Sequence, residues 1–257
     1  MNHQPRKRFG QNFLHDPGVI RRIVQAVSPR PGDRLVEIGP GQGAITRELL
    51  KAAGALQAIE LDRDLVGPLA AACAPFGELT THSADALRFD FTALAQDAKL
   101  RVVGNLPYNI STPILFHLLE QKSVIADMHF MLQREVVERM AADPGGKDYG
   151  RLSVMLQAWC RVTHLFDIGP GAFNPPPKVY SAFVRLTPYP EPPHPIQDRS
   201  RFAQVVTAAF GQRRKTLRNA LKGVLSAEQI ESCGIDPGAR AETLSVGDFA
   251  RLANRGE

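Results

Sequence analysis

The stretch that decides the fold is residues 33–46, DRLVEIGPGQGAIT, in which a short apolar run leads into three closely spaced glycines. The apolar run predicts a buried strand, and the apolar spacing that continues through Leu50 predicts a helix. Glycines between them let the backbone turn tightly and approach a ligand without a Cβ in the way. The spacing is GxGxG rather than the GxGxxG of dinucleotide-binding proteins, and no GK[ST] of a P-loop follows.

Strands and helices are expected to alternate along the residues that follow. Apolar runs predict strands at 55–60, 79–83, 100–104 and 125–132, and helical spacing predicts helices at 64–74 and around 115–119. Such alternation indicates right-handed βαβ units, which build a parallel sheet with helices on both faces. The predicted fold class is therefore α/β.

The C-terminal part of the chain has a different pattern. Residues 187–195, TPYPEPPHP, hold five prolines in nine positions, which excludes a helix and favours an extended linker. Beyond it, apolar residues recur at helical spacing from Phe202 to Phe210 and again at Leu217 and Leu221. We therefore expect an α/β domain over residues 1–187, a proline-rich linker over 188–199 and a small all-helical domain over 200–257.

Composition excludes several classes of protein. The 257 residues are 44% hydrophobic and 22% charged, with a net charge of +5, which indicates a folded rather than a disordered or fibrous chain. The basic N-terminus is not followed by the apolar run of a signal peptide, and no stretch reaches the roughly 20 apolar residues of a membrane span. The three cysteines form no CxxC pair and the histidines have no ligand-like spacing. We therefore expect no disulfide framework, no metal and a cytoplasmic location.

Two acidic residues that follow expected strands are candidates for ligand binding. Glu60 ends the second strand, where a carboxylate can accept hydrogen bonds from both hydroxyls of a ribose. Asp85 lies just beyond the third strand, at the same edge of the sheet, where it could accept a hydrogen bond from the exocyclic amine of adenine. An acid in that position more often caps a helix or faces solvent, so Asp85 by itself does not decide between these interpretations.

The motif ExGxGxG at 37–43, followed by an acid after the second strand and another after the third, resembles class I S-adenosylmethionine-dependent methyltransferases. The resemblance implies a Rossmann-like sheet and S-adenosylmethionine as the cofactor. It also implies that the glycine turn holds the amino-acid end of the cofactor, which has no pyrophosphate to bind. The cofactor-binding residues expected from these segments are Gly39, Gly41, Glu60, Leu61, Asp85 and Ala86.

A second motif, Asn105-Leu106-Pro107-Tyr108, comes directly after the fourth strand, at the end of the sheet where open α/β proteins bind ligands. The side-chain oxygen of Asn105 and the carbonyl oxygen of Leu106 can each accept a hydrogen bond from N6 of an adenine. Pro107 fixes the backbone so that the two acceptors converge, and Tyr108 offers a face on which the base can stack. The motif resembles the [DNS]PP[YF] signature of amino methyltransferases, in the NLPY form typical of RNA adenine-N6 enzymes.

Three further segments resemble the ribosomal RNA adenine dimethyltransferases, and together with the motifs above they span residues 9–222. FGQNFL at 9–14 implies that Asn12 and Leu14 contact the cofactor. FNPPPKV at 173–179 matches the pattern FxPxPxV, in which the phenylalanine, here Phe173, helps to clamp the adenine outside its stack. AFGQRRKTL at 209–217 opens the expected helical domain. The resemblance is to the branch of the family that acts on small-subunit rRNA.

That branch dimethylates N6 of two adjacent adenosines near the 3′ end of small-subunit rRNA. The resemblance thus implies, as partners, this rRNA and the assembling small ribosomal subunit, and a monomer suffices for the mechanism. The catalytic residues that it implies are Asn105, Leu106, Pro107, Tyr108 and Phe173, with Asn105 also contacting the cofactor.

Basic residues cluster at the start of the expected helical domain. Arg214, Arg218 and Lys222 are spaced by four, which predicts that they share one face of a helix. Such a run is usually a solvated face, but beside an adenine-methylating domain it is interpreted as a site for RNA phosphates. The complete RNA-binding set predicted here is Arg213, Arg214, Lys215, Arg218 and Lys222.

Three alternatives stay open at this point. The sister branch, which methylates an adenosine of large-subunit rRNA and confers macrolide resistance, shares the glycine turn and the NLPY motif. A ribosome-assembly or transcription factor could keep the fold and bind RNA without turnover, although the intact Glu60, Asp85, Asn105 and Tyr108 argue against lost chemistry. A DNA adenine methyltransferase would use the same nucleophile. The run RRKTLRNAL at 213–221 favours the small-subunit branch.

Overall fold

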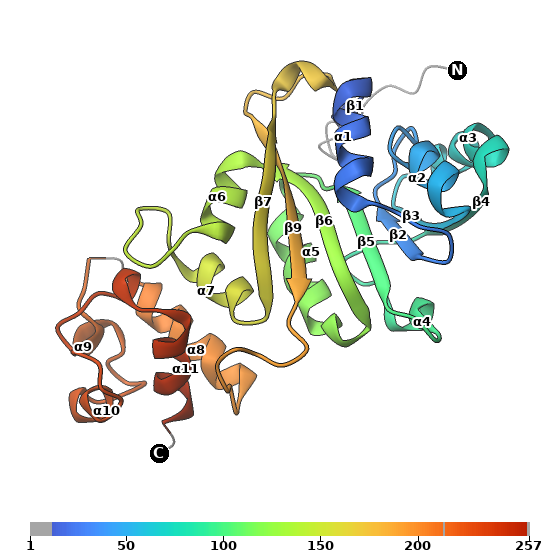
Figure 1. Ribbon diagram of the computed structural model, residues 1–257. Helices are drawn as coiled ribbons and strands as arrows, with labels where there is room; N and C mark the ends of the chain where they lie inside the picture. The colour runs from blue at the N-terminus through green and yellow to red at the C-terminus, as the bar shows by residue number, and fades with distance from the viewer. Residues whose placement is uncertain (1–11, 213, 256–257) are drawn as a thin grey trace. The chain divides into compact units, whose positions relative to one another are not determined.

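The computed structural model describes residues 12–212 and 214–255 (Figure 1). These residues form two compact units. The first reaches to Val137 and includes Thr163–Pro188, and the second consists of Glu138–Val162 and the residues from Tyr189 onward. The expected boundary at residue 187 lies beside this division, but the assignment of Glu138–Val162 to the second unit differs from the predicted domain boundaries.

A seven-stranded sheet with the order β4-β3-β2-β5-β6-β9-β7 organises the first unit (Figure 1). Strands β2 to β6 run parallel to one another, as predicted. Strand β9, in contrast, runs antiparallel to β6, with Ser181 opposite Gln133. The strands are β2 (Arg34–Ile38), β3 (Ala55–Glu60), β4 (Glu78–Ser83), β5 (Leu100–Asn105), β6 (Ile125–Gln133), β7 (Cys160–Ile168) and β9 (Ser181–Pro188). The sequence did not predict β7 and β9, so the expected parallel sheet is in fact mixed.

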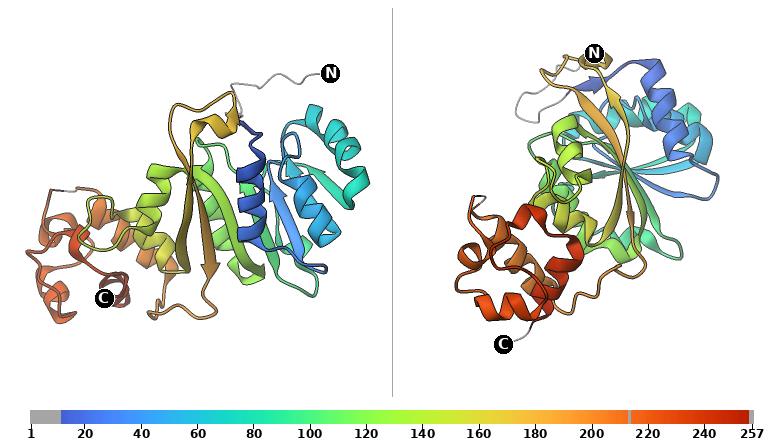
Figure 2. Two further views of the ribbon diagram at one scale, coloured as in Figure 1. Left: turned by 45° about the horizontal axis from the view of Figure 1, so that its top comes forward. Right: turned by 60° about the vertical axis from the view of Figure 1, so that its left-hand side comes forward.

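Helices on both faces of the sheet explain why its central strands are mostly apolar. In β2, the side chains of Leu35, Val36 and Ile38 are all buried, which is typical of a parallel strand covered on two sides. In Figure 1, α1 lies in front of the sheet and α5 behind it, and Figure 2 shows the same arrangement from two further directions. The helices here are α1 (Pro17–Val27), α2 (Thr46–Ala53), α3 (Arg63–Cys73), α4 (Thr92–Ala95), α5 (Ser111–Glu120) and the first half of α6 (Arg134–Ala141), which continues into the second unit.

A short antiparallel ladder fixes the start of the described chain. Strand β1 (Phe13–Leu14) pairs with β8 (Phe173–Asn174), with Leu14 opposite Phe173. Helix α1 begins directly afterwards, where the Asp16 carboxylate accepts hydrogen bonds from the N–H groups of Gly18 at 2.7 Å and Val19 at 2.9 Å. The capped helix start and the ladder together hold β1 in place.

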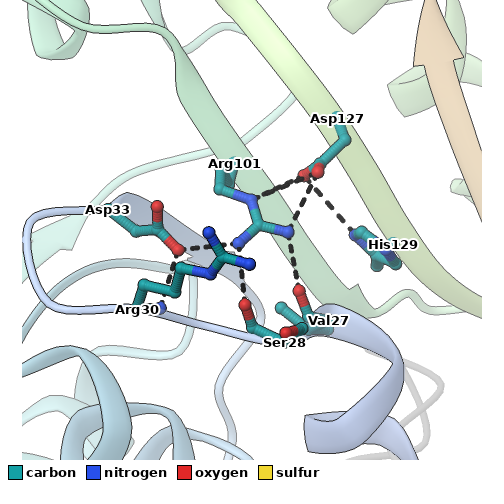
Figure 3. Close-up of polar contacts among 7 residues, drawn as sticks. All are labelled: Val27, Ser28, Arg30, Asp33, Arg101, Asp127 and His129. Carbon is teal, nitrogen blue, oxygen red and sulfur yellow. Dashed lines mark hydrogen bonds and ion pairs between the residues drawn. The ribbon is translucent and has the colours of Figure 1, made fainter.

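The C-terminal end of α1 is fixed by Arg101 on β5 (Figure 3). The guanidinium donates to the carbonyl oxygens of Val27 at 2.6 Å and Ser28 at 3.3 Å, to Asp33 at 2.7 Å, and to both carboxylate oxygens of Asp127 on β6 at 3.0–3.1 Å. These contacts satisfy backbone carbonyls at the end of the helix, which have no partner within it. One side chain thus ties α1 to two strands of the sheet.

The second unit is helical apart from the first residues of β7. Its helices are α7 (Arg151–Gln157), α8 (Arg199–Phe210), α9 (Leu217–Ala220), α10 (Ala227–Ser232) and α11 (Val246–Asn254). Phe202, Val205 and Val206 of α8 are buried at the predicted helical spacing, and the ring of Phe210 lies 5.6 Å from that of Phe249 on α11. The helical organisation expected after the proline-rich segment is therefore present.

The predicted basic helix face is not formed. Helix α9 covers only Leu217–Ala220, so Arg218 lies in it, whereas Arg214 lies before it and Lys222 in the turn after it. The N–H groups of Leu217 and Arg218 donate to carbonyls of the 237–239 segment, and Gly223 has a φ of +86°, so the helix is confined to little more than one turn. Arg213 lies outside the described residues.

Candidate active site

The glycine turn after β2 needs glycine at each of its three positions. Gly39, Gly41 and Gly43 have φ values of +66°, +57° and +78°, a region that other residues rarely adopt. A Cβ on Gly41 would lie 3.0 Å from the ring of Phe13, and a Cβ on Gly43 would lie 2.8 Å from Leu69. The turn therefore packs closely under β1 on one side and against α3 on the other.

Glu60, at the end of β3, is fixed beside this turn. It is 6% exposed, and its two carboxylate oxygens accept hydrogen bonds from the N–H groups of Gly41 at 3.2 Å and Asp62 at 2.8 Å. Burial raises the pKa of Glu60, while the two N–H donors oppose that rise. The carboxylate keeps further acceptor capacity, which a pair of ribose hydroxyls can use.

Asp85 and Leu61 lie at the same edge of the sheet. Asp85 Oδ1 accepts a hydrogen bond from the N–H of Leu87 at 3.0 Å, so the acid forms a local turn and presents its second oxygen to other groups. Leu61 is 50% exposed although it is a large apolar side chain. An exposed apolar face beside an acceptor oxygen suits a planar base that carries an amino group.

Glu37, on β2, is a residue of this site that the predicted set did not include. It is 2% exposed, and its Oε2 atom has no hydrogen-bond partner among the described residues. Burial raises the pKa of Glu37 to about 7; the Thr46 hydroxyl lowers the pKa in part and the charge of Glu60 adds to the rise. A buried acceptor without a partner is costly, so a donor from a ligand would stabilise it. Only its place at the start of ExGxGxG marked it in the sequence.

The Asn105–Tyr108 motif forms a turn between β5 and α5. The Asn105 Nδ2 group donates to the carbonyl oxygen of Asn12 at 3.0 Å, which leaves its Oδ1 without a partner among the described residues. The N–H of Leu106 donates to Met131 on β6 at 3.2 Å, so the turn is tied to the neighbouring strand. Tyr108 Oη lies 2.7 Å from Ser181 Oγ at the start of β9.

These groups meet in one cavity of about 350 Å³. It is lined by Glu37 and by every residue predicted to bind the cofactor or to take part in catalysis except Phe173: Asn12, Leu14, Gly39, Gly41, Glu60, Leu61, Asp85, Ala86, Asn105, Leu106, Pro107 and Tyr108. The cavity thus combines an apolar face, a closely packed glycine turn, and carboxylates suited to hydroxyl and amino donors. This set of groups fits S-adenosylmethionine, which has an amino-acid end, a ribose and an adenine.

Phe173 lies elsewhere, contrary to the prediction that it clamps the base. It is 2% exposed and belongs to the apolar core, together with Leu14, Ile168 and Phe183. Because its β-ladder partner is Leu14, its side chain supports the strand that covers the cavity rather than the cavity itself. The pattern FxPxPxV shows the position of a phenylalanine but not the direction in which its ring points.

The predicted RNA-binding residues that the structure describes belong to the second unit and do not line the cavity. Arg214, Lys215, Arg218 and Lys222 are all exposed. Within residues 12–212 and 214–255, no group of three His, Cys, Asp or Glu side chains is placed to hold a metal ion. In the same residues no helix is long and apolar enough to cross a membrane.

The mixed sheet, the glycine turn after its first long strand and the acids at its edge define a class I S-adenosylmethionine-dependent methyltransferase. The family model described as ribosomal RNA adenine dimethylase matches residues 2–257. The chain belongs to this family.

Individual relatives agree with this assignment. The ribosomal RNA small subunit methyltransferase A of Pseudomonas aeruginosa is 61% identical over 254 residues, which cover 98% of this chain and 95% of that protein. A dimethyladenosine transferase from Plasmodium falciparum has a similar structure, with a TM-score of 0.80, 24% identity and coverage of 93% of this chain and 95% of that one. The 23S rRNA methyltransferase ErmE has a TM-score of 0.76 at 26% identity, with coverage of 95% and 99%.

Proposed function

We propose that the protein transfers methyl groups from S-adenosylmethionine to N6 of two adjacent adenosines near the 3′ end of small-subunit rRNA, giving N6,N6-dimethyladenosine. One observation carries the proposal: the Asn105–Tyr108 turn opens into the same cavity as the glycine turn and Glu60. The acceptor groups for the amine and the groups suited to the cofactor are thus side by side. Catalysis in such a site is mainly a matter of positioning.

The cofactor would be held along the edge of β2, β3 and β4. Gly39 and Gly41 allow close approach of its amino-acid end, with Glu37 as a buried acceptor for its ammonium group. Glu60 would accept from the ribose hydroxyls, and Asp85 from the adenine amine, with Leu61 against the base. When bound, S-adenosylmethionine supplies an electrophilic methyl group on a sulfonium.

The residues of the NLPY turn would prepare the nucleophile. Adenine N6 is a poor nucleophile because its lone pair is delocalised into the ring. Asn105 Oδ1 and the Leu106 carbonyl would each accept one N6–H, which favours tetrahedral geometry at nitrogen and directs the lone pair. Because Asn105 Nδ2 is held by the Asn12 carbonyl at 3.0 Å, its Oδ1 is already oriented as an acceptor. Tyr108 would stack on the base after it leaves its own stack.

We infer a small-subunit rather than a large-subunit substrate from the degree of sequence identity to relatives of each kind. The fold is shared with a large-subunit enzyme, ErmE, but at 26% identity, whereas a relative named for the small subunit is 61% identical over almost the whole chain. We infer that the assembling small ribosomal subunit is the partner, that the protein acts as a monomer in the cytoplasm, and that Arg214, Lys215, Arg218 and Lys222 bind rRNA phosphates. The following test distinguishes this function from two alternatives: an enzyme that acts on the large subunit, and a factor that binds RNA without turnover.

The test is transfer of labelled methyl groups to purified small ribosomal subunits that lack the modification, with large subunits and duplex DNA in parallel. Digestion to nucleosides then identifies the product. We expect dimethyladenosine in small-subunit rRNA alone. Label in large subunits or DNA would assign another substrate, and cofactor binding without any transfer would contradict an enzymatic role.

A further inference from the structure

Tyr180 is the most exposed of the large hydrophobic side chains that the structure describes, at 54%. It lies directly before β9, whose first residue, Ser181, is opposite Gln133 at the end of β6. A single exposed aromatic residue is common on protein surfaces and by itself indicates nothing. Here, however, its surroundings fix the ring instead of leaving it free.

Arg134, the first residue of α6, holds Tyr180 in two ways. Its N–H donates to the Tyr180 carbonyl oxygen at 2.9 Å, and its guanidinium carbon lies 5.5 Å from the centroid of the ring. On another side, the ring lies close to Gly169, where an added Cβ would be in ordinary van der Waals contact with Tyr180 Cε1, at 3.8 Å. The ring is therefore oriented by a cation while more than half of the side chain stays exposed.

The next residue along the chain links this ring to the proposed catalytic turn. Ser181 is fully buried, and its Oγ lies 2.7 Å from Tyr108 Oη. Tyr180 and Tyr108 are therefore separated by one backbone residue and one hydrogen bond. That separation suits consecutive nucleotides of one strand, one base in the cavity against Tyr108 and its neighbour outside against Tyr180.

Charged side chains of both signs lie around Tyr180. The Arg134 side chain is 45% exposed, and Lys178 is exposed two residues before Tyr180. Asp167 lies 3.7 Å from Arg134, but its other carboxylate oxygen is 2.9 Å from His164 Nε2. Glu135 and Glu138 of α6 are also exposed. Because Asp167 is shared with His164 and the guanidinium is exposed, Arg134 can still contact a phosphate beside the ring.

We propose that Tyr180 and Arg134 bind the nucleotide that flanks the target adenosine, with the base stacked on Tyr180 and its phosphate at Arg134. This inference rests on the proposed function and adds the substrate residue next to the reacting one. It gives a physical reason for a substrate with two adjacent adenosines: the base that waits for its own methylation is held beside the cavity.

The experiment compares the full-length wild type with Y180A, Y180F and Y180L, using unmethylated small ribosomal subunits as the probe. Affinity for subunits, methyl transfer and S-adenosylmethionine affinity are measured for each. Stacking of one base is worth about 1–3 kcal/mol, so Y180A should bind subunits about fivefold or more weakly, with cofactor affinity unchanged. Y180F keeps the ring and should match the wild type. Y180L keeps apolar volume without a flat face and should resemble Y180A.

A second readout locates the contact. Ultraviolet cross-linking of the wild type to subunits should join the peptide that contains Tyr180 to a nucleotide immediately beside a target adenosine. If Y180A bound subunits as tightly as the wild type, or if the cross-link mapped elsewhere, the inference would be overturned while the proposed function stood. Absence of transfer by the wild type would instead overturn the proposed function, and this inference with it.

Discussion

Tyr108 Oη and Ser181 Oγ lie 2.7 Å apart, although 73 residues separate them in the chain. Ser181 is fully buried and begins β9, so the packing around it restricts the position of its hydroxyl. Burial raises the pKa of Tyr108, and the phenol therefore stays neutral and able to hydrogen-bond at physiological pH. The strand that makes the sheet mixed thus also fixes the orientation of the ring proposed to stack on the target base.

A double-mutant cycle tests whether this hydrogen bond positions Tyr108. Y108F keeps the ring and removes the phenol, whereas S181A removes the partner hydroxyl. If both act through one bond, each single variant should lower kcat/KM for small subunits by a similar factor, about 3- to 10-fold, and the double variant should be hardly worse than either. Cofactor affinity should not change. Additive losses would show that the two hydroxyls act independently.

Asn105 is expected to be needed for transfer and much less for cofactor binding. In N105A the acceptor for N6 is lost, and by analogy with the removal of a positioned hydrogen-bonding group we expect kcat to fall by about 100-fold or more. Single-turnover transfer and calorimetric titration with S-adenosylmethionine separate the two effects. Turnover near that of the wild type would mean that another group accepts the N6 hydrogen bond.

Gly41 is expected to be required for cofactor binding for two reasons: its positive φ, and the lack of space for a Cβ. In G41A the new Cβ would meet the Phe13 ring at 3.0 Å, in a residue with a φ of +57°. Gly32 is a matched control, because it has a φ of +90° and nothing within 4 Å of an added Cβ. Both alanine variants should lose about 1–2 kcal/mol of stability through backbone strain. Only G41A should also lose affinity for S-adenosylmethionine, about tenfold, measured by calorimetry; equal affinity in the two variants would contradict this.

Local sequence patterns predicted the parallel strands because burial on both faces leaves apolar residues at adjacent positions, as at Leu35 and Val36 in β2. The same reasoning missed β7, whose residues from Arg161 to Asp167 are mostly partly exposed and show no clean alternation. It also failed for Arg214, Arg218 and Lys222. Spacing by four places residues on one face only if one helix contains them all, and α9 ends at Ala220.

The residues of the candidate site also divide into those that local sequence motifs predicted and those that depend on tertiary packing. The glycine turn, Glu60 and the Asn105–Tyr108 turn could be predicted because each is a contiguous motif next to a strand end. Glu37 was not in the predicted set. The property that distinguishes it is a raised pKa, which comes from burial in the folded protein and is not visible in the local sequence. Phe173 was misplaced because a motif does not give the direction of a side chain, and Ser181 was missed because its partner is distant in the sequence.

Arg101 is expected to stabilise the fold in a pH-dependent way. In R101M the aliphatic part of the side chain stays, but Asp33, Asp127 and two helix-end carbonyls lose their donor. Because Arg101 and both carboxylates are largely buried, we expect the free energy of unfolding to fall by about 2 kcal/mol. R101K should recover only part of this, since one ammonium cannot reach all four acceptors.

The sign of the pH effect follows from Asp127. Burial raises its pKa, but His129 and Arg101 outweigh burial, so the pKa lies below the ordinary value. The stabilisation is therefore complete above the unfolded-state pKa of about 3.9 and is lost as the pH falls through the lowered folded-state value. In urea unfolding, the stability gap between wild type and R101M should be full at pH 7 and shrink below about pH 4. A gap that did not change with pH would exclude Asp127 as its source.

The exposed cations of the second unit should govern affinity for RNA without affecting the cofactor. Replacement of Arg214 and Arg218 by alanine should weaken binding to small subunits and reduce the slope of log affinity against log salt by up to about 1.4, since each lost phosphate contact contributes about 0.7 for single-stranded RNA. The effect does not require a shared helix face, because both side chains are exposed on either side of Leu217. The matched control is R161A/R255A, which removes two exposed charges from the same unit. An equal change of slope in both double variants would show that net charge, rather than this cluster, attracts the RNA.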